Sequence, residues 1–321
     1  MSIQEKIISL RDHVSNAIIG QETLVNRLLI ALLADGHLLV EGAPGLAKTK
    51  AVKTLASGLE ADFHRIQFTP DLLPGDVTGT EIYRPQDGSF IFQNGPIFHN
   101  LVLADEINRA PAKVQSALLE AMAERQITVG KVTYKLPELF MVMATQNPIE
   151  QEGTYPLPEA QLDRFLMHVK ISYPDPDTEK AILHINRNEM QPQNTPDTEF
   201  TRIDQNTIKE ARAQLTDIHI SAELEDYMIN LILTSRTPEK LDGNLKRLID
   251  FGSSPRGTIA LDRCARAQAW LNKRDFITPE DIQGVVHDVL RHRIIISFEA
   301  EAEGVSVDDI INRIVELVPV P

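Results

Sequence analysis

Short runs of consecutive apolar residues alternate with periodic segments through the first half of the chain. The apolar runs predict strands at 37–41, 63–68, 101–104, 139–144 and 165–171. Between them, apolar residues that recur every three or four positions predict helices at 21–34, 48–58 and 111–124. Strands that helices cover on both faces are apolar throughout their length. The order therefore predicts a doubly wound α/β fold with a parallel sheet.

The pattern changes near residue 174, after which helical spacing dominates. Predicted helices lie at 177–190, 205–215, 221–235, 256–273, 279–291 and 306–317. One of them has a clear start, because Thr278 suits an N-cap and Pro279 suits the first helical position. The polar, proline-containing segment 191–196 predicts a loop. We therefore expect an α/β domain over residues 1–173 and an all-helical domain over residues 174–321.

Two segments of the α/β domain show the alternation that is typical of β-hairpins. Residues 80–93 form two β-prone runs around the dipeptide Asp87-Gly88, which favours a tight turn. Residues 126–135 alternate in the same way around Gly130. Both segments interrupt the strand–helix alternation, where short connections are the rule. We expect them to be hairpin insertions.

Charge and composition narrow the classes of function. The formal net charge of the 321 residues is −14, which opposes generic nucleic-acid binding because that binding depends on basic side chains. The apolar runs are too short for a membrane span. The first residues lack the plan of a signal peptide, and Cys264 is the only cysteine, so no internal disulfide can form. We expect a cytoplasmic protein.

A glycine-rich segment joins the strand predicted at 37–41 to the helix predicted at 48–58. It reads Gly42, Ala43, Pro44, Gly45, Leu46, Ala47, Lys48 and Thr49, which nearly matches the P-loop pattern. Such a loop directs backbone N–H groups and the positive end of a helix at a phosphate. Lys48 would then reach the β- and γ-phosphates, and Thr49 would ligate Mg²⁺. Ala47 replaces the second glycine, which costs little if its φ is negative, so we expect the replacement to be tolerated.

Two adjacent carboxylates follow the apolar run at 101–104. In P-loop enzymes an acid at this point holds Mg²⁺ beside the P-loop hydroxyl, and a second acid can polarise the attacking water. We therefore expect Asp105 to bind the metal and Glu106 to act as general base.

Three further polar residues allow two interpretations each. Asn147 follows the apolar run at 139–144, where it could orient the lytic water or simply cap a strand-to-loop turn. Arg164 and Arg256 could each stabilise a transferring phosphoryl group. Alternatively, Arg164 could pair with a neighbouring carboxylate and Arg256 could cap a turn.

Taken together, these motifs resemble the AAA+ ATPases, and within them the MoxR family. The resemblance covers nearly the whole chain and includes Ile19-Gly20-Gln21, the segment 42–49, the segments 105–111 and 144–148, and Leu157 to Phe165. Alanine at position 47 is normal in that family. The resemblance implies a P-loop AAA+ core with β-hairpin insertions, a helical lid domain, and Mg²⁺-dependent hydrolysis of ATP.

Further roles come from the resemblance alone. It implies that Ile19, Gly20 and Gln21 lie beside the adenine, that Asn147 is the first sensor and that Arg256 is the second sensor on the lid. It also implies that Arg164 is an arginine finger acting on ATP in a neighbouring subunit, which requires a ring, expected to be a hexamer. In relatives the hairpins face the central channel, and many members act as chaperone-like motors with partners that carry von Willebrand factor A domains.

Two other functions remain as alternatives. The hairpin insertion is similar to that of helicase-like AAA+ proteins, so a nucleic-acid motor is one of them, although the negative charge argues against it. A scaffold that binds ATP without turnover is the other, and the presence of both Glu106 and Asn147 argues against it. We expect an ATPase that remodels or activates a protein partner.

Overall fold

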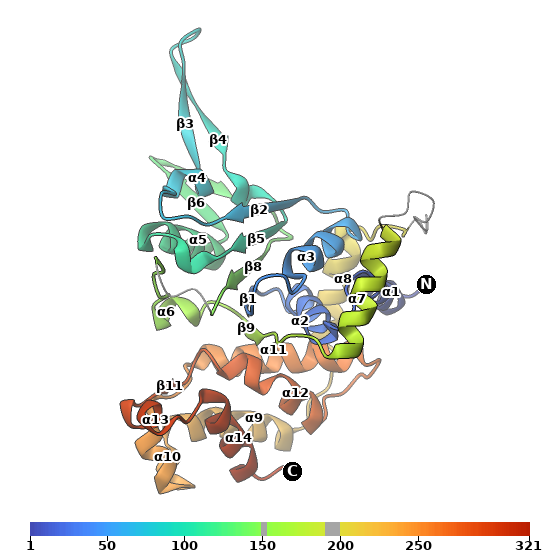
Figure 1. Ribbon diagram of the computed structural model, residues 1–321, viewed down its shortest axis with the longest axis vertical. Coiled ribbons are helices and arrows are strands. Elements are labelled where there is room, and N and C mark those ends of the chain that lie inside the picture. The colour runs from blue at the N-terminus through green and yellow to red at the C-terminus, as the bar shows by residue number, and fades with distance from the viewer. Residues whose placement is uncertain (149–152, 190–199) are drawn as a thin grey trace. The chain divides into compact units, whose positions relative to one another are not determined.

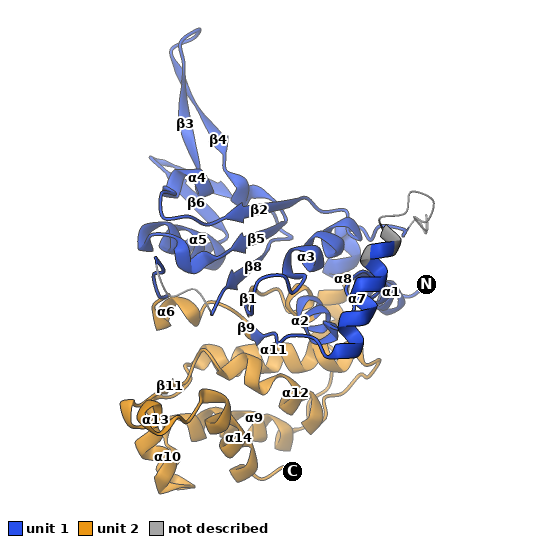
Figure 2. Ribbon diagram, viewed as in Figure 1, with its two compact units in different colours: residues 1–29, 40–156, 169–209 blue, residues 30–39, 157–168, 210–321 orange. Residues whose placement is uncertain are grey.

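The computed structural model describes residues 1–148, 153–189 and 200–321. Its first compact unit comprises residues 1–29, 40–156 and 169–209, and its second comprises residues 30–39, 157–168 and 210–321 (Figure 2). This division by packing differs from a single boundary at residue 174. The chain beyond that residue contributes helices to the first unit, and two short segments before it, 30–39 and 157–168, belong to the second. The loop predicted at 191–196 lies outside the described residues.

A five-stranded sheet forms the centre of the α/β part (Figure 1). Its strands are β1 (Leu38–Glu41), β2 (Phe63–Gln67), β5 (Leu101–Asp105), β8 (Met141–Gln146) and β9 (Met167–Lys170), in the order β2-β5-β8-β1-β9. Strands β2, β5 and β8 are parallel, with Ile66 opposite Ala104 and Ala104 opposite Ala144. The predicted parallel sheet is thereby confirmed, and the three strands end at one edge.

The longer helices that accompany the sheet match the periodic segments closely, whereas α1 and the short helices α4 and α6 have no predicted counterpart. They are α2 (Glu22–Leu33), α3 (Lys48–Ser57), α4 (Pro74–Thr78), α5 (Ala112–Glu124), α6 (Glu159–Leu162), α7 (Pro176–Glu189) and α8 (Gln205–Leu215), with short 3₁₀ turns η1 (Pro96–Phe98) and η2 (Ile107–Arg109). Helix α1 (Ile3–Ala17) was not predicted. It begins at a capping box formed by Ser2 and Glu5, and it packs against α3.

Both predicted hairpins are present in the first unit. Strands β3 (Gly79–Arg84) and β4 (Ser89–Asn94) form one, and β6 (Gln126–Val129) and β7 (Val132–Lys135) form the other. The β3–β4 hairpin projects well beyond the sheet of its own unit (Figure 1). Phe92 and Tyr134 stack with ring centroids 4.0 Å apart, so the two hairpins are in direct contact.

Residues 216–321, all in the second unit, are helical apart from one short antiparallel strand pair. The elements of this segment are α9 (Ala222–Arg236), η3 (Pro238–Lys240), α10 (Gly243–Leu248), β10 (Ile249–Phe251), α11 (Pro255–Leu271), α12 (Pro279–Leu290), β11 (Ile295–Ile296), α13 (Phe298–Glu303) and α14 (Val307–Leu317). Helix α12 begins where the sequence predicts, and the carboxylate of Asp281 accepts from the Thr278 backbone N–H. Among the described residues, no helix has the length and apolar character that a membrane crossing needs.

Candidate nucleotide-binding site

The P-loop connects β1 to α3 through a tight, glycine-dependent turn. A side chain at Gly42 would collide with Ile171, because an added Cβ would lie 2.3 Å from the Cγ1 atom. Gly45 adopts a φ of +86°, and Ala47, immediately before α3, adopts a φ of +55°. The condition under which alanine costs little is therefore not met. Ala47 is held in the left-handed region, where a Cβ carries a conformational cost.

The side chain of Lys48 folds back over this loop. Its Nζ donates to the Gly42 carbonyl oxygen at 2.6 Å. Burial lowers the pKa of Lys48, while the nearby carboxylates of Asp105 and Glu106 act in the opposite direction and favour the charged amine. A cation beside a glycine-rich loop, at the start of a helix, suits a phosphate.

The acidic pair stands at the carboxyl end of β5, opposite the end of β8. Thr145 joins the two residues, since its hydroxyl donates to Asp105 Oδ1 and accepts the backbone N–H of Glu106 at 2.9 Å. Glu106 has a φ of +58°, so the chain turns sharply directly after the strand. The threonine and the turn together direct the two carboxylates to different partners.

Strand β2 supplies two polar residues that the sequence analysis missed. Arg65 donates from Nε and Nη2 to Asp105 Oδ2, at 3.0 and 2.6 Å, and Gln67 donates to Glu106 Oε2 at 2.7 Å. Arg109 also donates to that Glu106 oxygen, at 3.1 Å. The alternating polar residues of β2 are visible in the sequence. Their partners follow only from the pairing of β2 with β5.

Two cavities, both within the first unit, flank the P-loop. One of about 390 Å³ is lined by residues 44–50 together with Arg65, Asp105, Glu106 and Asn147. The other, of about 320 Å³, is lined by residues 44–47 and by Ile19, Gln21 and Tyr173 among others. Gly20 is not among the lining residues; with a φ of +76°, it packs closely against Thr178 instead. Both volumes lie in the range of small-molecule sites. Most residues that line the first cavity are charged or polar, whereas most that line the second are apolar.

Comparison with known proteins gives consistent matches. Residues 37–167 match the model of the ATPase family associated with various cellular activities (AAA), and residues 244–314 match the AAA lid domain. Chaperone MoxR1 of Mycobacterium tuberculosis is 45% identical over 96% of this chain and 80% of its own length. Protein MoxR of Methylorubrum extorquens is 33% identical over 96% of this chain and 93% of its own length. This chain belongs to the MoxR family of AAA ATPases.

The fold agrees with that of a solved relative. A crystal structure of a protein from Cytophaga hutchinsonii superimposes with a TM-score of 0.90, at 46% identity, over 99% of this chain and 96% of that one. The MoxR-family core and lid are thus both present here, and the parallel sheet, hairpins and helical lid are confirmed.

Arg164, the expected arginine finger, and Arg256, the expected second sensor, belong to the second unit. The other candidate residues belong to the first unit. Arg164 is half-buried and follows α6, where its backbone N–H donates to the Gln161 carbonyl. Arg256, in the first turn of α11, is exposed, and its Nη1 lies 3.8 Å from Asp163 Oδ2. Asp163 therefore lies next to Arg164 in the chain and next to Arg256 in space.

Proposed function

We propose that this MoxR-family protein hydrolyses ATP with Mg²⁺ and uses the energy to remodel or activate a protein partner. The observation that carries the proposal is the cavity of about 390 Å³, which Lys48, Thr49, Asp105, Glu106 and Asn147 line together. These residues come from two strand ends, those of β5 and β8, and from the start of helix α3. Such a convergence of a cation, two carboxylates and an amide supports phosphoryl transfer to water.

The donor atoms of the cavity fit a magnesium ion. Mg²⁺ prefers hard oxygen ligands, and Thr49 and Asp105, which line the same cavity as Lys48, provide a hydroxyl and a carboxylate. Mg²⁺ would supply charge neutralisation at the phosphates. In this proposal Lys48 binds the β- and γ-phosphates and Asn147 orients the attacking water.

Glu106 is the proposed general base. Its carboxylate lines the same cavity and is held by Gln67 and Arg109. A general base has to be held within reach of the proton it accepts. Both hydrogen bonds reach the same oxygen, Oε2, and keep Glu106 in one orientation. The presence of Glu106 together with Asn147 in this cavity favours turnover over a scaffold that only binds ATP.

The second cavity supports a site for the adenine. Ile19, Gln21 and residues 44–47 of the P-loop line it together, so a base placed there would be continuous with a phosphate at the loop. Gly20 lets the backbone between Ile19 and Gln21 pack closely against Thr178, because any side chain at this position would collide with Thr178. Apolar walls with one amide suit a purine ring.

Arg164 and Arg256 are the proposed transition-state and nucleotide-sensing arginines. Arg164 would act in trans on ATP held by a neighbouring subunit, which needs a ring, proposed to be a hexamer. Arg256 would act as the second sensor. Arginine suits both roles because its planar guanidinium binds phosphate oxygens in pairs.

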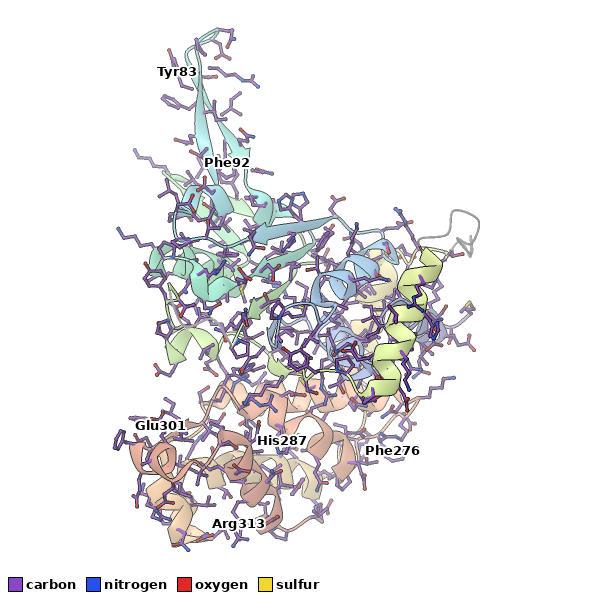
Figure 3. The ribbon with its side chains drawn as sticks, viewed as in Figure 1. Tyr83, Phe92, Phe276, His287, Glu301 and Arg313 are labelled. Carbon is purple, nitrogen blue, oxygen red and sulfur yellow. The ribbon has the colours of Figure 1, made fainter. Side chains whose placement is uncertain are left out.

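A protein client is proposed from the exposed hairpin β3–β4. Tyr83 is 52% exposed and Phe90 is 66% exposed, and their rings are paired near the outer end of the hairpin (Figure 3). Exposed aromatic residues on a projecting element are typical of a contact surface. The net charge of −14 favours a protein over a nucleic acid. The proposed setting is the cytoplasm, and the proposed partner is a protein with a von Willebrand factor A domain. The name of the similar chaperone MoxR1 supports a chaperone-like function.

The test is the rate of ATP hydrolysis by wild type, Glu106→Gln and Lys48→Ala, with the mass of each protein measured in ATP and in ADP. We expect Mg²⁺-dependent hydrolysis and ATP-induced rings in wild type. Glu106→Gln should bind ATP and form rings but hydrolyse at least 100-fold more slowly, roughly the contribution of a general base. Lys48→Ala should lose ATP binding, and Glu120→Gln, at an exposed position of α5, is the matched control. Normal turnover in Glu106→Gln, or tight ATP binding by Lys48→Ala, would contradict the proposal.

A further inference from the structure

The carboxylate of Asp163 has different partners on its two oxygens, all within the second unit. Oδ1 accepts from Arg293 Nε at 2.8 Å, and Oδ2 accepts from Ser254 Oγ at 2.8 Å. Arg256 Nη1 lies 3.8 Å from the same Oδ2. Ser254 is the N-cap of α11 and Arg256 is in its first turn, so Asp163 joins the segment that carries Arg164 to the helix that carries Arg256.

Arg293 anchors this carboxylate from the core of the lid. Its side chain is only 2% exposed, and it donates to the carbonyl oxygens of Asp163 and Phe165 as well as to the Asp163 carboxylate. These two carbonyls flank Arg164 in the chain. A buried cation needs such a full set of partners, because an unpaired charge in the interior is strongly unfavourable.

The residues before Arg293 continue the same arrangement. His292 Nε2 is 3.1 Å from the Phe165 carbonyl oxygen, and Arg291 donates to the His168 carbonyl oxygen. Three consecutive residues after α12 thus bind the backbone of residues 163–168. The path of the chain on both sides of Arg164 is set by the lid.

We propose that Asp163, anchored by Arg293, is a positioning residue that holds Arg164 and Arg256 in one rigid body. The two arginines then move together, so that the nucleotide state sensed by Arg256 changes the position of Arg164. This inference rests on the roles proposed above for the two arginines. The hydrogen bonds and the burial within the second unit support the rigid body independently of those roles.

The first test compares the effect of Arg164→Ala in two backgrounds. In the wild-type background we expect kcat to fall by about 1,000-fold, as for other arginine fingers. In Asp163→Asn we expect a further loss of less than threefold, because Arg164 is already misplaced. A purely structural defect in Asp163→Asn would lower only the amount of active enzyme, and Arg164→Ala would then lower kcat by the same factor in both backgrounds. Equal factors would overturn the proposal.

A milder pair of variants guards against loss of folding. Ser254→Ala and Ser221→Ala each remove the N-cap hydroxyl of a lid helix, but only Ser254 bonds Asp163. We expect Ser254→Ala to lower kcat about tenfold and Ser221→Ala to change it less than twofold. Equal kcat values in the two variants would count against a positioning role.

The second test measures the rigid body without any activity. Nitroxide labels at Ala160→Cys and Ile259→Cys, both exposed, report the distance between α6 and α11, and Cys264 is fully buried and therefore protected from labelling. We expect one narrow distance distribution, with and without ATP, that broadens in Asp163→Asn and in Ser254→Ala. An unchanged narrow distribution in both variants would overturn the positioning role while the two arginine assignments stand. Broadening together with full activity of Arg164→Ala would leave the rigid body in place and remove the proposed finger instead.

Discussion

Replacement of Ala47 by glycine should stabilise the first unit. Ala47 is the residue immediately before α3 and has a φ of +55° and a ψ of +16°, in the left-handed region. A Cβ there costs about 1–2 kcal/mol relative to a right-handed conformation. The surrounding loop is held by the close contact of Gly42 with Ile171 and by the hydrogen bond from Lys48 to Gly42. The alanine therefore stays in this conformation despite its cost.

The net gain is smaller than the strain that is relieved. Glycine loses about 0.4–1 kcal/mol more conformational free energy than alanine on folding, which offsets part of the gain. We expect Ala47→Gly to raise the free energy of unfolding of the first unit by about 0.5–1 kcal/mol. With a urea dependence of about 2 kcal/mol per molar, the midpoint should rise by about 0.2–0.5 M.

Two spectroscopic probes allow this change to be assigned to the correct unit. Trp270 is the only tryptophan in the chain and lies in α11, so its fluorescence follows the second unit, whereas far-ultraviolet circular dichroism follows both. The urea transition assigned to the first unit should shift upward in Ala47→Gly. Gly45→Ala is the control with the opposite sign, because Gly45 has a φ of +86° and an added Cβ would meet no atom within 4 Å. A lower midpoint in Ala47→Gly, or a higher one in Gly45→Ala, would refute the strain argument.

Three further predictions concern the acidic pair and the buried histidine. Glu106→Gly should relieve a φ of +58° and abolish hydrolysis, and the net stabilisation should be at most about 0.5–1 kcal/mol, as for Ala47→Gly. Arg125→Gly, from a φ of +52°, should give a similar urea shift with unchanged kcat. Burial places the pKa of His292 well below 6.5, so the folded state keeps this histidine neutral while the unfolded state protonates it. The free energy of unfolding should therefore fall by up to about 1.4 kcal/mol per pH unit as the pH drops below 6.5. Urea titrations of His292→Gln should lack this pH dependence. Arg65→Gln frees the Asp105 oxygen from a half-exposed ion pair, which contributes about 0.4–1 kcal/mol. The Mg²⁺ concentration needed for half-maximal binding of a fluorescent ADP analogue should therefore fall about twofold to fivefold. An unchanged or higher Mg²⁺ requirement would contradict competition between Arg65 and the metal for Asp105.

Much of this molecule is predictable from local sequence, because the relevant interactions are local. The P-loop is one continuous strand–turn–helix, so its residues can be recognised without knowledge of any other part of the chain. The apolar runs of β1, β5 and β8 mark buried strands, and Thr278-Pro279 marks the start of α12 since capping involves only adjacent residues. Both hairpins were predicted for the same reason.

Tertiary structure decided which polar groups meet. Arg65 and Gln67 reach the acidic pair only because β2 pairs with β5, and Thr145 bridges Asp105 and Glu106 only because β8 pairs with β5 on the other side. Strand order is a non-local property that hydrophobic spacing leaves open.

Backbone conformation and long-range charge pairing are non-local in the same way. The positive φ of Ala47 follows from the packing around the P-loop, and local preference alone favours a negative value. The Asp163–Arg293 pair joins residues 130 positions apart, and the Arg293 side chain is removed from water, so this pairing depends on how the distant segments of the second unit pack. Sequence by itself therefore determined the chemistry that is available, and the packing of distant segments determined which of those groups could act on one another.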